Sequence, residues 1–338
     1  MVVPPVDASV DLSVQLGPIR LAHPLINASG TFDLFEVADA VDGGLLREPP
    51  VAAYVPKTVT LEPRRGNEPP RIVETAGGML NSIGLPNKGV EAFIAEDLPR
   101  LLSLPRPVIL NVGGFSPAEY GLLAARLRRA LEAAGLGSPS ASGSSATSTG
   151  VQASWTSRVG LELNISCPNV HSGCISIGTD PVETRAAVKG ARDEWPGLLV
   201  AKLTPNIGDI RPIALAAAEG GASAISLVNT FKGLALDRVS LRPYLGGVTG
   251  GLSGPAIKPL ALRLCYEVAE TVDLPLIGMG GVVEVQDVLD MMACGASVVA
   301  VGAAGFRDPW LPATLARQLA VRLRDRGWTL ADVLRRAH

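Results

Sequence analysis

Short apolar segments recur along the chain, and amphipathic stretches separate most of them. The segments V-I-L-N-V at 108–112 and L-L-V-A-K-L at 198–203 are almost continuously apolar, which is typical of strands buried on both faces of a parallel sheet. Nearly every segment ends at a loop marked by glycine, asparagine or proline. The predicted strands lie at residues 25–28, 51–56, 108–112, 160–165, 198–203, 224–228, 274–278 and 297–301.

Between these strands the apolar positions follow the period of an α-helix. Residues 117–134 place Tyr120, Leu123, Leu127 and Leu131 on one stripe. Similar patterns predict helices at 88–102, 181–194, 209–219, 255–271 and 284–293. The eight predicted strands therefore alternate with helices along most of the chain. This alternation favours an α/β fold in the form of a closed parallel (β/α)8 barrel, a TIM barrel, over an open sheet.

Three stretches interrupt the alternation. Residues 135–157 are rich in serine and other small residues, and we predict a disordered surface insertion there. Residues 60–86 and 231–254 follow the second and sixth strands as long loops. Such loops emerge at the C-terminal face of the strands, where barrel enzymes build their active sites. We expect one domain over residues 1–338 with a site at this face.

The composition indicates a globular protein with a large core, because 47% of the 338 residues are hydrophobic and 18% are charged. A net charge of −2 gives no overall excess of positive charge that would indicate nucleic-acid binding. Residues 1–11 lack the features of a signal peptide, and no apolar run approaches the roughly 18 residues of a membrane span. We therefore expect a cytoplasmic protein that binds neither nucleic acid nor membrane. The four cysteines include no C-x-x-C pair, so neither a zinc site nor an iron–sulfur cluster is supported.

Polar side chains lie near the C-terminal ends of five apolar strands. They are Lys57, Asn111, Asn164, Lys202 and Asn229. Any one of them can be a satisfied core group, but five at the same ends of different strands indicate a site. A lysine in an apolar strand requires an anionic partner or a lowered pKa. Lys57 and Lys202 therefore predict an anionic ligand.

Glycines after the last two strands narrow the class of ligand. Gly280 and Gly281 follow the seventh strand and Gly302 follows the eighth, which is where barrels bind phosphate. Backbone N–H groups can approach phosphate oxygens there because glycine has no side chain. Glycine is also common in ordinary turns, so this signal is weak alone. The chain contains neither a G-x-G-x-x-G dinucleotide fingerprint nor a nucleotide P-loop.

One thiol lies between two amides just past the fourth strand, in N-I-S-C-P-N. Asn164 and Asn169 provide donors and acceptors that suit a heterocycle with alternating N–H and C=O groups. A free thiol titrates near about 8.5, so Cys167 can serve as a general base, and an inert core cysteine is the alternative. Of the other cysteines, Cys265 and Cys294 fall in helical apolar patterns and are interpreted as inert, whereas the role of Cys174 is left open. The three histidines, His23, His171 and His338, form no evident pair.

Four motifs together resemble class 1 dihydroorotate dehydrogenases over about residues 10–305. They are N-A-S-G-T-F at 27–32, N-S-I-G-L-P-N at 81–87, N-I-S-C-P-N at 164–169 and G-G-L-S-G-P-A-I-K-P at 250–259. The last motif and the segment at 169–178 are more similar to the NAD-linked class 1B than to the fumarate-using class 1A. The insertion at 135–157 and the residues beyond Arg307 lie outside the likeness, and Cys174 stands where the family has a small residue.

The resemblance implies oxidation of (S)-dihydroorotate to orotate in de novo pyrimidine (UMP) biosynthesis, with one FMN per chain and no metal. Cys167 would remove the C5 proton while flavin N5 accepts hydride from C6, and Lys202 would stabilise negative charge on the reduced flavin. The implied FMN contacts are Ser29, Lys57, Thr58, Asn111, Asn164, Lys202, Val228, Gly254, Gly280, Gly281, Gly302 and Ala303. The implied substrate contacts are Lys57, Asn81, Ser82, Ile83, Gly84, Leu85, Asn164, Asn169, Asn229 and Thr230.

Likeness to class 1B also implies a partner subunit that carries FAD and a 2Fe–2S cluster and passes electrons to NAD. We expect a homodimer of this chain flanked by two such subunits in a heterotetramer. Several alternatives stay open. They are a fumarate-linked class 1A enzyme, a dihydropyrimidine dehydrogenase-like enzyme acting on uracil or thymine, a flavin-free Schiff-base lyase using Lys57 or Lys202, and a non-catalytic binder of a phosphate ligand.

Overall fold

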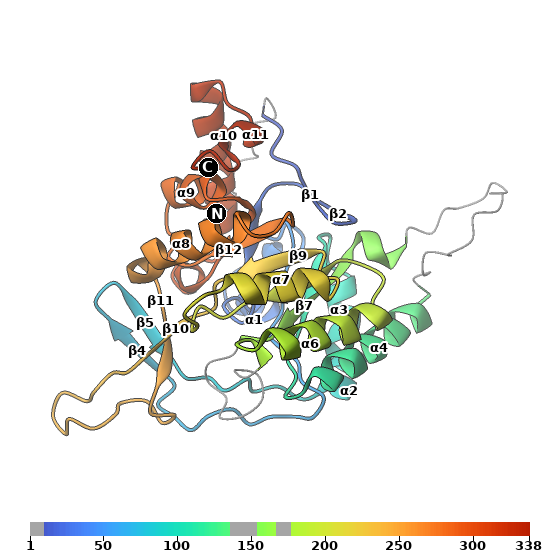
Figure 1. Ribbon diagram of the computed structural model, residues 1–338, viewed down its shortest axis with the longest axis vertical. Coiled ribbons are helices and arrows are strands. Elements are labelled where there is room, and N and C mark those ends of the chain that lie inside the picture. The colour runs from blue at the N-terminus through green and yellow to red at the C-terminus, as the bar shows by residue number, and fades with distance from the viewer. Residues whose placement is uncertain (1–9, 136–153, 167–176) are drawn as a thin grey trace.

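The computed structural model describes residues 10–135, 154–166 and 177–338, and Figure 1 gives its layout. Seven parallel strands form one sheet in the order β3-β13-β12-β9-β8-β7-β6. Each coincides with an apolar segment of the sequence to within two residues. The strands are β3 (Leu25–Asn27), β6 (Val108–Val112), β7 (Val159–Asn164), β8 (Leu199–Lys202), β9 (Ala224–Leu227), β12 (Leu276–Met279) and β13 (Ala296–Val301).

The remaining predicted strand, residues 51–56, makes one isolated bridge, between Tyr54 and Val108, instead of a regular ladder. The Ala52 N–H donates to the Leu25 carbonyl at 2.9 Å, and the Ile109 N–H donates to the Tyr54 carbonyl at 2.9 Å. Leu25 belongs to β3 and Ile109 to β6, the two edge strands of the sheet. The segment therefore bonds to both edges.

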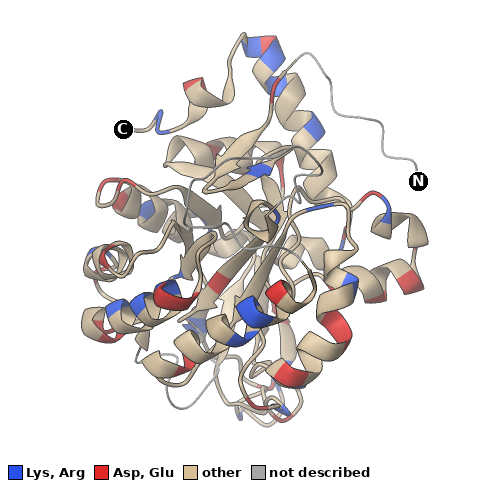
Figure 2. Ribbon diagram, turned by 90° about the vertical axis from the view of Figure 1, so that its right-hand side faces the viewer, with Lys and Arg blue, Asp and Glu red and all other residues tan. Residues whose placement is uncertain are grey.

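Helices follow most of the strands and cover one face of the sheet. Their caps agree with the sequence: the Asp180 side chain accepts hydrogen bonds from the first turn of the helix that begins at Pro181. Charged residues concentrate on these helices, with both signs interspersed, as Figure 2 shows. The helices are α1 (Leu34–Ala40), α2 (Val90–Ala92), α3 (Leu98–Leu102), α4 (Pro117–Ala133), α6 (Pro181–Glu194), α7 (Arg211–Glu219), α8 (Lys258–Ala269), α9 (Val285–Ala293), α10 (Leu311–Arg326) and α11 (Leu330–Val333).

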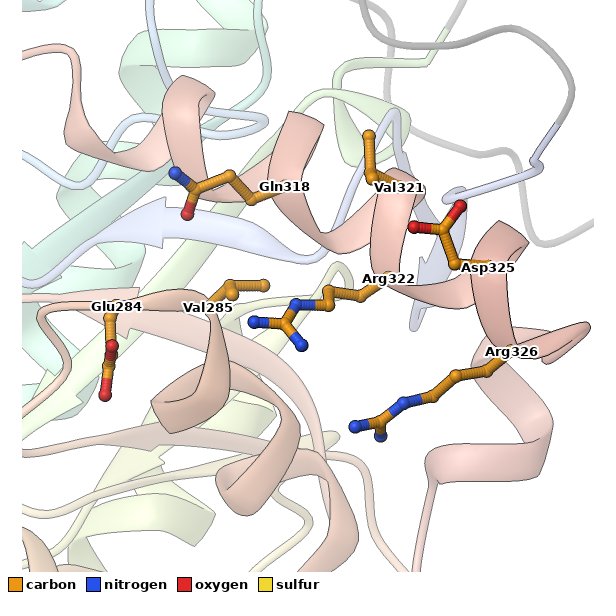
Figure 3. Close-up of a pocket in the computed structure, with 7 residues that line it drawn as sticks. All are labelled: Glu284, Val285, Gln318, Val321, Arg322, Asp325 and Arg326. Atoms are coloured by element: carbon orange, nitrogen blue, oxygen red, sulfur yellow. The ribbon is translucent and has the colours of Figure 1, made fainter.

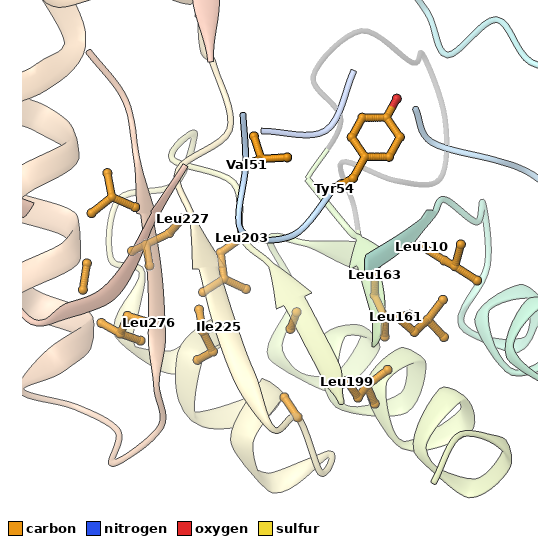
Figure 4. Packing of buried hydrophobic residues seen from close by; sticks show 14 of the residues in the cluster. Val51, Tyr54, Leu110, Leu161, Leu163, Leu199, Leu203, Ile225, Leu227 and Leu276 are labelled. Carbon is orange, nitrogen blue, oxygen red and sulfur yellow. The ribbon is translucent and has the colours of Figure 1, made fainter. Parts of the chain in front are cut away.

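The sheet separates two hydrophobic clusters. The outer cluster fills the space between the strands and the helices, and Figure 4 shows part of it around Leu110, Leu161 and Ile225. The inner cluster lies on the opposite face, which we call the inner face, and includes Ile109 and Ile277. It also contains the apolar side chains of a hairpin, β1 (Val14–Leu16) and β2 (Ile19–Leu21). Burial on both faces explains why the strands read as continuous apolar runs.

The two segments predicted as long loops, 60–86 and 231–254, contain strands, so the loop prediction was wrong for these parts. They form an antiparallel sheet in the order β10-β11-β5-β4, which brings the two segments side by side. Its strands are too short and too rich in glycine to produce an alternating pattern. A Cβ on Gly78 would lie 2.0 Å from the Ser253 carbonyl oxygen, so the strands can approach only with glycine there. The strands are β4 (Ile72–Thr75), β5 (Gly78–Asn81), β10 (Phe231–Gly233) and β11 (Gly250–Ser253).

The residues at 154–157, which composition alone assigns to the surface insertion, are packed. Trp155 and Thr156 are buried, and the Trp155 ring lies 4.7 Å from the ring of Trp195. The rest of the predicted insertion, 136–153, lies outside the described residues. Along the described part of the chain, no helix is long and apolar enough to cross a membrane.

Candidate functional site

A group of polar side chains occupies the inner face of β6, β7, β8 and β9. Strand register places Asn111 beside Glu162, Asn164 beside Lys202, and Lys202 beside Ser226. All five are buried. Their strand neighbours belong to the outer cluster, so alternation points these five side chains inward. Three of them were predicted from the sequence, and Glu162 and Ser226 were not.

Glu162 links two strands on either side of its own. Its Oε1 accepts a hydrogen bond from Asn111 Nδ2 at 2.5 Å, and its Oε2 accepts one from the Ser226 hydroxyl at 2.7 Å. The remaining polar atom of the Asn111 amide, Oδ1, is buried and has no partner among the described residues. A glutamate inside the apolar run of β7 was the sequence signal that could have found this residue.

Asn164 bonds to one other predicted residue directly and to a second one through a serine. Its Nδ2 donates to the Thr58 hydroxyl at 3.1 Å, and its Oδ1 accepts from the Ser166 hydroxyl at 3.0 Å. Asn229 Nδ2 in turn donates to Ser166 Oγ at 2.9 Å. The structure therefore brings Thr58, Asn164 and Asn229 into one network, which sequence reasoning found without its central member, Ser166.

The two lysines predicted to face an anion differ in burial. Lys202 is 5% exposed, and within the described chain it makes no hydrogen bond or ion pair. Lys57, which follows the segment 51–56, is exposed. A buried ammonium group without a partner is unfavourable unless a ligand compensates its charge. Lys202 is therefore the residue of this pair that indicates an anionic ligand.

The residues predicted to bind substrate on β5 and after β9 meet at Gly251. Asn81 Nδ2 donates to the Gly251 carbonyl at 3.3 Å. A Cβ on Gly251 would lie 1.8 Å from the Thr230 hydroxyl oxygen, so Thr230 packs directly against this glycine. Thr230 is tied to its neighbour because its N–H donates to Asn229 Oδ1 at 2.8 Å.

The turn that follows β5 is shaped around Asn67. Its amide Nδ2 donates to the buried Ser82 hydroxyl at 2.9 Å, and its backbone N–H donates to the Ile83 carbonyl at 3.0 Å. Gly84 has φ of +76°, and a Cβ there would lie 2.4 Å from Asn67 Oδ1, so the turn requires glycine. Leu85 follows, also in the left-handed region with φ of +57°.

Two glycines after β12 pack against the start of α8. Gly280 and Gly281 have φ of +128° and +76°. A Cβ on Gly280 would lie 2.7 Å from the Ala261 Cβ, and one on Gly281 would lie 2.7 Å from the Lys258 Cβ. The tight fit and the positive φ angles both require glycine here. The same position on Gly280 lies 3.4 Å from Val228, another predicted residue.

An ion pair behind these glycines holds the turn in place. Lys258 Nζ lies 2.5 Å from Asp287 Oδ1 and 2.7 Å from Asp290 Oδ2. The Asp287 carboxylate also accepts the backbone N–H groups of Val283 at 2.8 Å and Glu284 at 2.9 Å. Partial burial opposes the charge on Lys258, but hydrogen bonds to the two aspartates outweigh it and raise the pKa of the ammonium group.

The other predicted cofactor residues lie at neighbouring ends of the inner face. The Ser29 hydroxyl donates to the Pro56 carbonyl at 2.9 Å, next to Lys57. A Cβ on Gly302 would approach nothing closer than the Ala28 Cβ at 3.9 Å, so this glycine is not crowded, and Ala303 follows it. Gly254 has φ of +106° and lies against Gly78 of the antiparallel sheet.

Two central predicted residues, Cys167 and Asn169, lie outside the described residues, as do Cys174 and His171. Of the described cysteines, Cys265 is buried, and burial raises the pKa of its thiol to about 12. Burial likewise raises the pKa of the half-buried Cys294 thiol. A raised pKa disfavours the thiolate, which supports the interpretation of both as unreactive cysteines. No group of three or more metal-ligating side chains occurs in the part of the chain that the structure describes.

A hollow of about 570 Å³ lies elsewhere, against α10 and the start of α9 (Figure 3). None of the predicted site residues lines it. Arg322 and Arg326 share its wall with Asp325 and Glu284, so its charges are mixed and it has no single electrostatic preference. The polar inner face and its neighbouring glycine turns are therefore the candidate site.

Comparison with known proteins gives one consistent result. A family profile described as dihydroorotate dehydrogenase matches residues 11–323, which extends beyond the likeness found in the motifs. The chain is 42% identical over 324 residues to the dihydroorotate dehydrogenase B (NAD(+)), catalytic subunit, of Geotalea uraniireducens, covering 96% of both chains. It is 43% identical over 320 residues to the protein of the same name from Desulforudis audaxviator, covering 94% of both.

Proposed function

Because the chain belongs to the dihydroorotate dehydrogenase family, we propose that it is the catalytic subunit of an NAD-linked enzyme that oxidises (S)-dihydroorotate to orotate in de novo pyrimidine biosynthesis. The observation that carries this proposal is the identity of 42% over 96% of the chain with a protein named for that activity. The polar inner face supports it, since Asn111 Oδ1 and the Lys202 ammonium group lack partners among the described residues, and a bound ligand can supply them.

We infer that the seven-stranded sheet closes into an eight-stranded (β/α)8 barrel within one domain of residues 1–338. The hydrogen bonds from segment 51–56 to both edge strands support closure, and so does the inner cluster sealed by the β1–β2 hairpin. In such a barrel the ends of β6 to β9 and the glycine turns after β12 and β13 share one mouth. The catalytic site would lie in that mouth.

FMN fits this mouth on three observations. Among the described residues, Asn111 Oδ1 is a buried acceptor without a partner, and Lys202 is a buried cation that makes no hydrogen bond or ion pair. A Cβ on Gly302 would meet nothing closer than the Ala28 Cβ at 3.9 Å, so a phosphate could approach the backbone there. When bound, FMN supplies a hydride acceptor. The residues proposed to hold it are Ser29, Lys57, Thr58, Asn111, Asn164, Lys202, Val228, Gly254, Gly280, Gly281, Gly302 and Ala303.

The protein's own groups have distinct roles in the proposed reaction. Amides of Asn81, Asn164 and Asn229 would orient the pyrimidine ring through its alternating donors and acceptors. Cys167 would take the proton from C5. Lys202 would place its positive charge beside the flavin, where negative charge would develop when the flavin is reduced. The other proposed substrate contacts are Lys57, Ser82, Ile83, Gly84, Leu85, Asn169 and Thr230.

The electron acceptor is proposed from the relatives' name, which describes a catalytic subunit linked to NAD. We propose a homodimer of this chain in a heterotetramer with a partner subunit that holds FAD and a 2Fe–2S cluster, working in the cytoplasm. The chain itself has no dinucleotide fingerprint and no C-x-x-C pair, so NAD reduction would require the partner.

One anaerobic experiment tests substrate and acceptor together. The purified chain is reconstituted with FMN, mixed with dihydroorotate, and then exposed to fumarate, to NAD alone or to NAD with the partner subunit. We expect dihydroorotate, but not dihydrouracil, to bleach the flavin, and only NAD with the partner to reoxidise it. Rapid reoxidation by fumarate would assign the chain to the fumarate-linked class. A chain that takes up no FMN would overturn the proposal.

The proposed base is tested by replacing its thiol. Cys167→Ala is expected to keep FMN binding and to slow flavin reduction by about 10²–10⁴-fold, the usual range for loss of a general base. Cys294→Ala is the matched control, since that half-buried thiol lies on the helical side of the sheet. Stopped-flow absorbance of the flavin measures both. Equal rates for wild type and Cys167→Ala would remove this cysteine from the mechanism.

A further inference from the structure

Glu162 is a buried carboxylate to which the proposed reaction assigns no role. It is 3% exposed and lies in the middle of β7, between Asn111 on β6 and Ser226 on the strand beyond β8. It forms no ion pair within the described residues, and both of its oxygens accept hydrogen bonds from neutral groups. A carboxylate buried in this way is costly unless its bonds are needed.

The carboxylate determines which way the Asn111 amide is turned. An ionised carboxylate only accepts hydrogen bonds, so the atom of Asn111 that lies 2.5 Å from Glu162 Oε1 must be the amide nitrogen. The amide oxygen, Oδ1, then points away from Glu162. This orientation follows from the chemistry of the pair, and it leaves Oδ1 as the atom that Asn111 presents to a ligand.

That oxygen is buried and has no partner in the described chain. Buried polar atoms are nearly always satisfied, and an unpaired one indicates a missing donor. Resting on the proposed function, the donor would come from FMN. The oxidised flavin ring carries a single N–H group, at N3, so N3–H is the donor that this acceptor can select.

We propose that Glu162 is a positioning residue that fixes Asn111 so that its Oδ1 accepts the flavin N3–H. Ser226 completes the arrangement because its hydroxyl donates to the other carboxylate oxygen at 2.7 Å. Glu162 and Asn111 together make the site specific for a flavin ring with a hydrogen on N3. Neither Glu162 nor Ser226 touches the ring in this arrangement; both act through Asn111.

The hydroxyl of Ser226 allows a double-variant test, because it can both donate and accept. In Glu162→Gln, the new amide can give its NH2 to Ser226 and keep its oxygen toward Asn111, which preserves the orientation. In Ser226→Ala, the carboxylate still faces Asn111. In the double variant, the glutamine NH2 has an acceptor only at Asn111 Oδ1. Since a buried N–H tolerates the absence of a partner less well than a carbonyl does, the Asn111 amide then turns over.

The measurement is the affinity of the full-length apoprotein for FMN and for 3-methyl-FMN, whose N3 carries a methyl group. Quenching of flavin fluorescence gives both dissociation constants. We expect the wild type, Glu162→Gln and Ser226→Ala to prefer FMN by about tenfold or more, the worth of one buried hydrogen bond. In the double variant, the ratio of the two dissociation constants is expected to fall by about tenfold. Thermal unfolding of the apoproteins, followed by circular dichroism, should give similar midpoints for all four.

Two results would overturn the inference about Glu162 while leaving the proposed function intact. One is a wild-type protein that binds FMN and 3-methyl-FMN equally well. The other is a double variant that is folded and keeps the full wild-type preference. A wild type that binds neither flavin is a different result, because it would remove the proposed function and the inference with it.

Discussion

The inner face of the sheet has two halves whose strands pair in register and yet carry opposite chemistry. Ser226, Lys202 and Asn164 form a polar row across β9, β8 and β7. The same row continues into β12 and β13 with Ile277 and Val298. Polarity therefore changes between two directly paired residues, Ser226 and Ile277. The strand pairing is therefore the same along this row, while the polarity of the side chains changes.

The difference indicates a division of labour between side chains and backbone. The polar half presents amides, a carboxylate and a lysine from the strands themselves. The apolar half is packed with aliphatic side chains of the inner cluster and presents glycine turns at the ends of β12 and β13. A bound FMN would therefore have its ring held by side chains and its phosphate held by backbone N–H groups. The predictions below test whether the halves separate in this way.

The largest effect is expected on the polar half, at Lys202. Lys202→Met keeps most of the length of the unbranched side chain and removes its charge. Because a positive charge in a buried site stabilises developing negative charge strongly, we expect flavin reduction by dihydroorotate to slow by about 10²–10³-fold. Anaerobic stopped-flow absorbance measures the rate. An unchanged rate would mean that the charge of Lys202 serves only the fold.

A pH effect is expected at the base of the apolar half, where His23 precedes β3. Burial, and then the positive charge of Arg106, lower the pKa of His23 to about 4 from its ordinary 6.5. Its Nδ1 accepts a hydrogen bond from the Leu25 N–H at 3.2 Å, which requires the neutral ring. The unfolded chain therefore binds the proton first as pH falls. Stability is full above about pH 6.5 and declines as pH falls toward 4.

Urea unfolding at several pH values measures this contribution. Between pH 7 and pH 5 we expect His23 to account for a loss of about 2 kcal/mol in the free energy of unfolding. His23→Gln should remove that part of the slope and leave the part due to the carboxylates. If the variant and the wild type lose stability in parallel over this range, the histidine is not buried as a neutral ring.

A smaller effect is expected where the apolar half supports the glycine turns. Asp287→Asn weakens the hydrogen bonds to Val283 and Glu284 and the ion pair with Lys258. We expect the dissociation constant for FMN to rise about tenfold, in line with the loss of a charged hydrogen bond. Riboflavin, which lacks the phosphate, should bind as before.

Asp290→Asn is the matched control for that experiment. It removes the charge of the second partner of Lys258 and leaves the backbone hydrogen bonds of Asp287 in place. Its affinity for FMN is expected to stay close to that of the wild type. Equal losses of FMN and riboflavin binding in Asp287→Asn would show that the turn supports the ring as well, and the division between the halves would then be wrong.

The strands could be predicted because burial on both faces leaves continuous apolar runs in the sequence, and most of the helices could be predicted from their apolar periodicity. Neither signal depends on knowing which elements lie next to each other. The helix at Leu311–Arg326 was missed, although Leu315, Leu319 and Leu323 repeat on one face of it. The antiparallel sheet could not be found in this way. Its strands have three or four residues, and its two halves are joined only by the pairing of β5 with β11, which brings together residues more than 150 positions apart in the sequence, such as Gly251 and Asn81.

The candidate site was predictable where the residue type alone was unusual. A lysine or asparagine ending an apolar strand is visible in the sequence, and so are paired glycines after a strand. Glu162 and Ser226 were missed because their importance lies in their hydrogen-bond partners. Glu162 accepts a hydrogen bond from Asn111, and Ser226 donates one to the Glu162 carboxylate. Those partners are set by strand register, which the sequence of a single chain does not give.

The smallest effect is expected at Ile277, the apolar neighbour of Ser226. Ile277→Val removes one buried methylene from the inner cluster and should lower the free energy of unfolding by about 1 kcal/mol. Urea denaturation of the apoprotein measures that change. Because the side chain offers no polar group to the site, the rate of flavin reduction should stay within about twofold of wild type. A tenfold slower rate would mean that packing beside Ser226 sets the position of Glu162 and Lys202, so that the two halves act as one unit.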